Sequence, residues 1–444
     1  MDDRLDKAIT PQFLLKFSLP TILSMVLMSA FGIVDSLFVS RLIDTHALSA
    51  VTIAFPFLMF ALSIGFMLGV GGNALTAKTI GENQLDKARA IFSFILLVSF
   101  VVSGVMSSFG LISPTTLASF LGADTQIQPL VIEYLTPIIW FLPMIVMGVL
   151  FQQFLMTEGK AHISTISYLI GGLTGVFLNW LFIGVLQMGL FGAAMATGLS
   201  MSLNSLIGFV YFIRNKKGTL YFVKPKWDTK VLVSSATNGS SELVTMMSTA
   251  VLATFMNNIL MTLDGPIAVA AVGITFSTMN ILASLFIGYA SGILPIIGFN
   301  YGKKDTDRLK LLYKYSMVII ALVSLVTTGL AWGLASPLIR IFDVGPGDPV
   351  YVMAIRSFRI ITIGFVFMGV SSFASMMFTA LQNGLISALI SLCRTLLFSI
   401  VTLLILPRLF GLTGAFMAIP AAELLGLAVT LFILNRMKTR YQYA

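Results

Sequence analysis

The sequence predicts an all-α integral membrane protein whose twelve transmembrane helices form two parallel six-helix bundles. Composition is the first observation that predicts this fold: hydrophobic residues make up 57% of the 444 residues, charged residues only 10%, and the mean hydropathy is +0.97. Such values lie outside the range of soluble globular proteins. The second observation is a series of apolar runs, each about 20 residues or longer. The third is a sequence motif that recurs half a chain later.

The recurring motif indicates an internal duplication. Residues 189–196 read GLFGAAMA and residues 411–418 read GLTGAFMA, 222 positions apart. Further pairs keep nearly the same offset and the same order: Ala47–Val51 with Ala268–Val272, Gly81, Asp86 and Arg89 with Gly302, Asp307 and Lys310, and Met147–Val149 with Met368–Val370. Several anchors in one order predict two copies of one structural unit.

The apolar runs between charge clusters define the predicted spans. Those of the first half cover 13–40, 47–77, 89–113, 128–157, 161–186 and 189–213. Those of the second half cover 231–262, 268–299, 308–335, 349–381, 384–407 and 411–435. Lipid offers no water to the backbone groups, so runs this long and this apolar are expected to be helices.

The basic residues predict the orientation. With the N-terminus inside, the inner segments hold 21 Lys and Arg and the outer loops hold 3. This positive-inside pattern predicts that both termini are cytoplasmic in the cell membrane. Six spans per half make the repeats parallel. We therefore expect an N-terminal lobe at 1–213, a cytoplasmic linker at 214–230 and a C-terminal lobe at 231–444.

Several function classes lack their sequence signals. The chain has no GxxxxGK[ST] phosphate loop, and His46 and His162 are its only histidines, so neither a built-in ATPase nor a metal-ligand cluster is predicted. No Ser/His/Asp arrangement suggests an enzyme. We assign the net charge of +9 to membrane topology rather than to nucleic-acid binding. The lone Cys393 excludes an internal disulfide, no removable signal peptide is predicted, and no cofactor is expected.

Two acidic residues inside the spans are the main candidates for ion coupling. Asp35 lies in the first span and Glu242 in the seventh, and a charge at membrane depth is costly enough to need an explanation. Either carboxylate is a possible site for a proton or a sodium ion; no other metal site is predicted. Alternatively, Asp35 pairs with Arg41 at the outer interface, and Glu242 balances the dipole of its helix. The two acids are not repeat copies of each other.

Other residues in the spans have weaker signals. Pro20, in the first span, predicts either a hinge or a static kink. Three amides are candidates for lining a substrate cavity or for bonding between helices: Asn179, Gln152 and Asn204. Arg356 and Arg359 share a helix face, and they are expected to extend to the lipid headgroups or to pair with an acid such as Glu133 or Glu423. The role of Arg394 stays open.

The sequence resembles the multidrug and toxic compound extrusion (MATE) family over nearly its whole length. The resemblance is carried by VDSLFVSRLIDTHALSAV, which starts at Val34, by LNWLFIGVLQMGLFGAAMAT at 178–197, and by Pro20. It implies a V-shaped pair of lobes that exports organic cations in exchange for protons or sodium ions. It also implies that Asp35 couples the ion, that Pro20 is the point where the first helix bends, and that Glu242 contributes to coupling.

This chain departs from the family pattern at two places. Where span five often carries Asn and, four residues later, Asp, this chain has Gly175 and Asn179. An acidic position of span ten in some members is Ser371 here. A coupling scheme that needs either acid is therefore in doubt, and the resemblance leaves Asp35 and Glu242 to carry it.

Together these observations predict a monomeric secondary antiporter in the lipid bilayer, with small organic cations and other amphipathic compounds as substrates. The alternative is a flippase of lipid-linked oligosaccharide or cell-wall precursors. A flippase would need a cationic cavity for a diphosphate headgroup, and Arg356, Arg359 and Arg394 are the candidates for it.

Overall fold

The computed structural model describes the backbone of residues 5–43, 45–342 and 344–444, and their side chains except at 36, 40, 41 and 45–48. Every element in this part of the chain is a helix, and no strand occurs among the described residues. The predicted all-α class is confirmed. The helices are long because uninterrupted apolar sequence lets each one satisfy its backbone hydrogen bonds internally.

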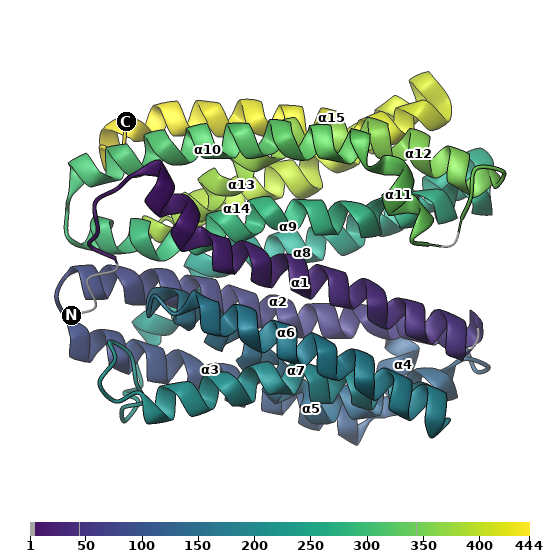
Figure 1. Cartoon of the computed structure of the whole chain (residues 1–444), viewed down its shortest axis with the longest axis horizontal. Helices are drawn as coiled ribbons and strands as arrows, with labels where there is room; N and C mark the ends of the chain where they lie inside the picture. The colour runs from purple at the N-terminus through teal and green to yellow at the C-terminus, as the bar shows by residue number, and fades with distance from the viewer. Residues whose placement is uncertain (1–4, 44, 343) are drawn as a thin grey trace. The chain divides into compact units, whose positions relative to one another are not determined.

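The described residues of the first half form six long helices and one short one, which Figure 1 labels. They are α1 (Pro11–Leu42), α2 (Thr45–Gly81), α3 (Leu85–Ile112), the short α4 (Pro114–Phe120), α5 (Gln128–Thr157), α6 (Ala161–Asn179) and α7 (Gly189–Arg214). A π-helical segment, η1 (Trp180–Val185), extends α6.

The second half repeats this order with more interruptions. Its elements are α8 (Thr229–Asp264), α9 (Pro266–Gly302), α10 (Thr306–Gly333), the short α11 (Ala335–Arg340), α12 (Pro349–Ile361), the 3₁₀ segment η2 (Thr362–Gly364), α13 (Phe365–Ala380), α14 (Gly384–Leu392), the π segment η3 (Cys393–Leu397) and α15 (Phe398–Tyr441). The short helices α4 and α11 begin at repeat-equivalent positions, which supports the duplication.

The predicted spans are confirmed as apolar helices. Eleven helical stretches of the described chain are long and apolar enough to cross a membrane, and the last of them is Gly384–Tyr441. This stretch is interrupted within α15 at Gly411, whose φ of +55° is not helical. It therefore holds the two predicted spans 384–407 and 411–435, because a residue without a Cβ can adopt this turn between them.

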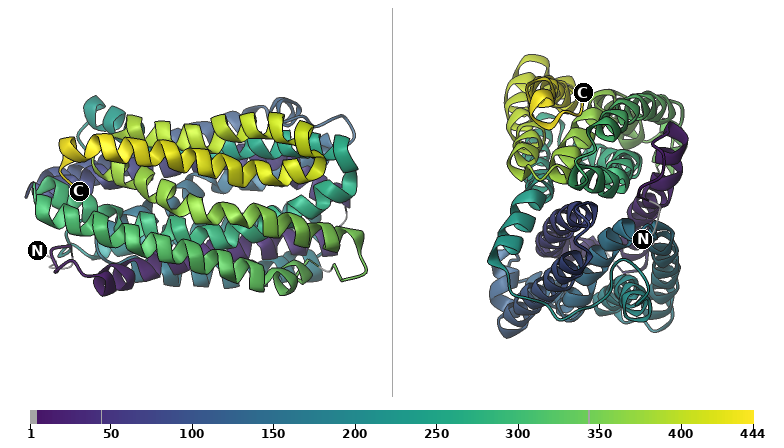
Figure 2. Two further views of the ribbon diagram at one scale, coloured as in Figure 1. Left: turned by 90° about the horizontal axis from the view of Figure 1, so that it is seen from above. Right: turned by 90° about the vertical axis from the view of Figure 1, so that its left-hand side faces the viewer.

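The chain packs as two compact units. The first unit contains Leu27–Gly239, and the second contains Ala8–Val26 and Ser240–Ala444. In the first unit, α2, α3, α5, α6 and α7 run alongside one another (Figure 1). An end-on view shows the helix bundles in cross-section (Figure 2). These packing units differ from the sequence repeats, because α1 and α8 each begin in one unit and end in the other.

Glycines allow the crossing parts of α1 and α8 to pack closely. In the first unit, a Cβ at Gly71 would overlap the Ser235 carbonyl oxygen, and one at Gly239 would overlap that of Met67. In the second unit, a Cβ at Gly288 would lie 2.6 Å from the Ile22 Cα. Close backbone approach through small residues is typical of helix pairs in membranes.

The repeat continues beyond the last helix of each half. In the first unit, Phe222 of the connecting segment packs on Phe92 with ring centroids 5.4 Å apart. In the second unit, Tyr443 packs on Tyr313 at 5.0 Å. Each residue of the second pair lies 221 positions after its counterpart. The ring contact therefore recurs in both units, although residues 436–441 are helical while their counterparts 215–220 are not.

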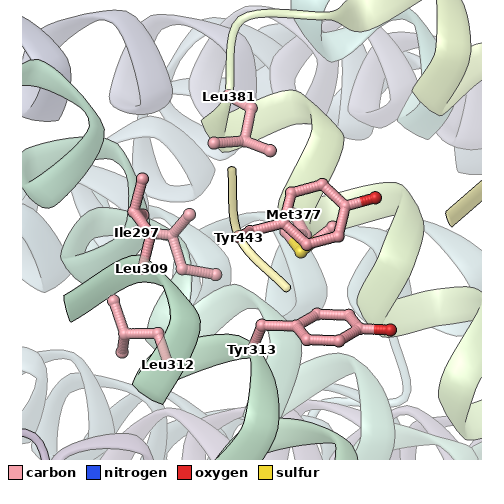
Figure 3. Close-up of a pocket in the computed structure, with 7 residues that line it drawn as sticks. All are labelled: Ile297, Leu309, Leu312, Tyr313, Met377, Leu381 and Tyr443. Carbon is pink, nitrogen blue, oxygen red and sulfur yellow. The ribbon is translucent and has the colours of Figure 1, made fainter. Parts of the chain in front are cut away.

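The Tyr443 ring lines a small, mostly apolar pocket in the second unit, together with Ile297, Leu309, Leu312, Tyr313, Met377 and Leu381 (Figure 3). The ring is 1% exposed, and its hydroxyl donates to the Leu434 carbonyl oxygen over 2.8 Å. Burial raises the pKa of the Tyr443 phenol, so the hydroxyl keeps the proton that it donates. The chain's own C-terminal tail therefore forms one wall of this pocket.

Candidate functional site

Asp35 lies in the part of α1 that belongs to the first unit. Its carboxylate is half-buried, and its Oδ1 accepts a hydrogen bond from the Asn179 Nδ2 over 2.8 Å. Asn179 is the last residue of α6 and is 1% exposed. The structure thus brings together two residues that lie 144 positions apart and were predicted separately. The side chain of Arg41, the alternative partner of Asp35, lies outside the described side chains.

The α6 helix makes room for this contact with glycines. A Cβ at Gly175 would lie 3.2 Å from the Ser200 Oγ and 3.9 Å from the Asp35 Oδ1. A Cβ at Gly172 would overlap the Phe31 ring of α1. Gly172 therefore leaves space for the Phe31 ring of α1, and Gly175 allows the close approach of α6 to Ser200 of α7 beside Asp35.

The helix geometry changes directly after Asn179. The π segment η1 starts at Trp180, and π-helical turns are frequent at functional sites because they shift the register of the following side chains. Asn179 is less exposed than Asp35. The buried amide therefore anchors the hydrogen bond, and the carboxylate is the accessible group.

Two residues that the sequence analysis did not select complete the Asp35 site. The Tyr134 hydroxyl of α5 is hydrogen-bonded to the Thr197 side chain of α7 and lies within electrostatic range of Asp35. Thr197 stands at the end of the quoted motif at 178–197, which was the available signal. The Asp35 site, made of Asp35, Asn179, Tyr134 and Thr197, thus combines one carboxylate with neutral oxygen and nitrogen groups. Such a set suits a proton or a monovalent cation.

The other two predicted amides bond within the first unit. Gln152 is 2% exposed, and its Oε1 accepts from the Tyr168 hydroxyl over 2.9 Å. The Asn204 Oδ1 accepts from the Ser167 Oγ over 3.0 Å. Both bonds join two helices, as one of the two predicted alternatives requires. A role of either residue in a substrate cavity stays a prediction.

Pro20 lies in the part of α1 that belongs to the second unit. The helix continues through it without a break, and the Ser24 Oγ donates to the Pro20 carbonyl oxygen over 2.9 Å. The passage of α1 from one unit to the other falls between Pro20 and Asp35. The predicted hinge therefore lies on one side of this passage and the predicted coupling residue on the other.

Glu242 of α8 belongs to a second charged centre, in the second unit. Its electrostatic partner is Arg394 of η3, which is 7% exposed. The Arg394 Nη1 lies 3.6 Å from the Glu423 Oε2 and donates to the Ser372 Oγ over 2.8 Å. We call these four residues, Glu242, Arg394, Glu423 and Ser372, the Arg394 cluster. Glu423 therefore does not pair with Arg356 or Arg359.

The remaining charged candidates have local roles. The exposed Arg356 donates to the Thr413 Oγ1 over 2.6 Å, and the Arg359 carbonyl oxygen accepts from the Trp332 side chain. The Glu133 Oε1 accepts from the backbone N–H of Phe191 over 3.1 Å, in the first turn of α7, where an acid complements the helix dipole. No group of three or more potential metal ligands occurs among the described residues.

Comparison with a protein-family model decides the family. The model, described as MatE, matches residues 20–181 and again residues 243–405. The chain belongs to the MatE family. Two matches in one chain also confirm the duplication, since the second repeats the first half a chain later.

Known MatE-type proteins align over nearly the whole chain. Multidrug export protein MepA of Staphylococcus haemolyticus (strain JCSC1435) is 23% identical over 427 residues, which cover 96% of this chain and 94% of that protein. MepA of Staphylococcus aureus (strain MRSA252) is 22% identical over 432 residues, with the same coverage. A crystal structure of MATE in complex with MaL6 superimposes with a TM-score of 0.93 at 21% identity, covering 100% of this chain and 99% of that chain.

MatE membership makes the chain a multi-pass membrane transporter of the multidrug export type and gives meaning to its departures from the family pattern. Gly175 supplies space at the Asp35 site, and Asn179 supplies the amide donor there. Ser371 is fully buried, and its Oγ accepts from the Thr430 hydroxyl over 3.2 Å. In this MatE protein, Gly175 and Asn179 of the first unit and Ser371 of the second unit are therefore all uncharged.

Proposed function

We propose that this MatE protein is an antiporter that exports amphipathic, often cationic compounds across the cytoplasmic membrane in exchange for protons or sodium ions. Family membership and the name of the aligned relatives, Multidrug export protein, support the export function. The half-buried Asp35 carboxylate, held by Asn179, is the observation that carries the coupling. We further propose that the protein acts as a monomer with both termini in the cytoplasm.

Competition at Asp35 gives a simple coupling scheme. The charged carboxylate attracts a cationic substrate, and a proton or sodium ion that binds to Asp35 removes this attraction and favours release outside. The hydroxyls of Tyr134 and Thr197 would supply further oxygen ligands for sodium. The Asn179 amide orients the carboxylate while leaving its second oxygen for the exchange.

Glu242 has a different place in the scheme. Its electrostatic partner is the fixed cation Arg394, whereas the described partner of Asp35 is a neutral amide. We therefore assign the principal ion exchange to Asp35 and a supporting role to Glu242. The helix α1 changes from one unit to the other between Pro20 and Asp35. Ion binding at Asp35 would therefore bend α1 at Pro20 and move the second unit.

Transport in proteoliposomes tests the proposal. A pH gradient and a sodium gradient are imposed separately, and uptake of the cationic dye ethidium is followed. Asp35→Asn should abolish the gradient-driven component. The matched control is Asp264→Asn, which removes an exposed acid at the end of α8 and should leave transport unchanged. Full gradient-driven transport by Asp35→Asn would remove Asp35 from the scheme.

The flippase alternative is not favoured. Its diphosphate site required free arginines, but Arg394 is paired with Glu423, and Arg356 is exposed and bonded to Thr413. Scrambling of a fluorescent lipid in the same proteoliposomes separates the two functions. We expect no scrambling above the rate in empty liposomes.

A further inference from the structure

A buried arginine lies at the centre of the second unit. Arg394 is 7% exposed and sits in η3, within a stretch that is otherwise apolar. Its guanidinium is held at several points: the Nη1 donates to the Ser372 Oγ over 2.8 Å and to the Met368 carbonyl oxygen over 3.4 Å. A buried charge persists in a membrane protein only where partners compensate it.

A glycine on the neighbouring helix α15 leaves space for the Arg394 side chain. Gly426 lies one helical turn after Glu423 on α15, and a Cβ there would be 2.9 Å from the Arg394 Cγ and 3.0 Å from its Cβ. The π segment that carries Arg394 adds a local change of register.

Two acids share this single cation. The Glu423 Oε2 lies 3.6 Å from the Arg394 Nη1 and has no hydrogen-bond partner among the described residues. Glu242 interacts electrostatically with the same guanidinium from α8. The Arg394 cluster therefore has one more acid than base, and the ion pair that it contains is long. A cation whose ion pair is long and that lies next to an excess acid can be displaced from that acid by another cation.

The arrangement belongs to the second unit alone. The repeat-equivalent positions of Arg394, Glu423 and Glu242, by the offsets of the nearest matching motifs, are Leu173, Met201 and Thr21. Conversely, the equivalent of Asp35 is Met256, which is fully buried in an apolar core with Leu260, Leu403 and Phe416. The duplication supplied the scaffold, whereas each unit holds its own charged centre.

We propose that Arg394 is a specificity-determining residue: a tethered counter-cation that occupies the acids Glu242 and Glu423 and competes with cationic ligands for them. The inference deepens the proposed export function by adding a second cation-sensitive site. A cation that approaches Glu242 must displace the guanidinium, whereas a neutral amphipathic compound does not meet this competition. Arg394 thereby limits the preference of the protein for cations.

Binding of two dyes to the purified full-length protein tests this inference without requiring transport. Ethidium is a permanent cation and Nile red is neutral. Arg394→Gln should bind ethidium about tenfold more tightly, because it removes a positive charge that lies beside two acids. Glu423→Gln should bind ethidium several-fold more weakly, because Arg394 then pairs with Glu242 alone. Nile red affinity should stay within twofold in both variants.

The two single variants should change ethidium affinity in opposite directions, and this distinguishes a specificity role of Arg394 from a structural one. A merely structural arginine would lower the affinity for both dyes in both variants. The double variant Arg394→Gln/Glu423→Gln restores the charge balance and should return ethidium affinity to within about threefold of wild type, even if Arg394→Gln alone folds poorly. An unchanged or weakened ethidium affinity in a folded Arg394→Gln protein would overturn the inference. If the wild-type protein binds ethidium but does not transport it, this result would instead count against the proposed function.

Discussion

The Asn179 amide donates to the Asp35 carboxylate over 2.8 Å, and this bond ties α6 to the second part of α1. It links a residue on the helix that passes between the units to the residue that directly precedes the π segment η1. We therefore expect that binding of an ion at Asp35 affects α6 first. The strength of this bond should therefore affect ion coupling more than it affects folding.

Asn179→Leu is expected to reduce gradient-driven ethidium transport about tenfold, because Asp35 loses the donor that orients it. Transport by proteoliposomes under the imposed gradients measures the effect. Asn204→Leu is the matched control, since it removes an interhelical amide of the same unit that bonds to Ser167 instead. Equal losses in the two variants would show that Asn179 acts through general packing.

Gly175→Val should also impair coupling, by crowding. The added side chain would meet Ser200 at about van der Waals distance or closer and would extend toward Asp35. We expect a loss of transport of about tenfold or more under the same gradients. Gly104→Val controls for the helix propensity of valine, since a Cβ at Gly104 has nothing within 4 Å. Normal transport by Gly175→Val would show that this space is not needed.

Gly71→Ala tests the close crossing of α2 with the first part of α8. The new methyl group would overlap the Ser235 carbonyl oxygen, so the helices must separate, at a cost of about 1–3 kcal/mol in stability. Thermal unfolding of the detergent-solubilised protein is the measurement. Gly273→Ala in α9, where a Cβ meets open space, should unfold at the wild-type temperature or slightly above it. An unchanged unfolding temperature in Gly71→Ala would contradict the crossing geometry.

Tyr443→Ala and Phe222→Ala should destabilise the protein by similar amounts, about 3–5 kcal/mol each, because each deletes a packed aromatic ring, on Tyr313 in the one case and on Phe92 in the other. Tyr443→Phe should cost only about 1 kcal/mol, since it loses the bond to Leu434 and keeps the ring. Thermal unfolding distinguishes the three. A large effect of one ring and none of the other would argue that only one of the two segments is docked.

The sequence was sufficient to predict the helices and the repeat, because lipid leaves an apolar run few choices of structure. It also identified Asp35 and Asn179 individually. It could not predict that they touch, since the contact depends on the close approach of α1 and α6 at Gly172 and Gly175. For the same reason, the sequence left open whether Glu423 pairs with Arg356 or Arg359, and the structure places Arg394 next to Glu423 instead. Such contacts are set by tertiary packing, which leaves no periodic signal in the sequence.

The exchange of helix segments between the units has a consequence for dissecting the molecule. If the chain is cut between Lys224 and Asp228, the N-terminal fragment keeps the start of α1 but lacks the second unit, into which this segment packs. The C-terminal fragment keeps the start of α8 but lacks the first unit, into which that segment packs. Each fragment would thus carry the piece that the other lacks. Neither half should be stable when produced alone, whereas the two co-expressed halves should complement each other and be purified as a non-covalent pair.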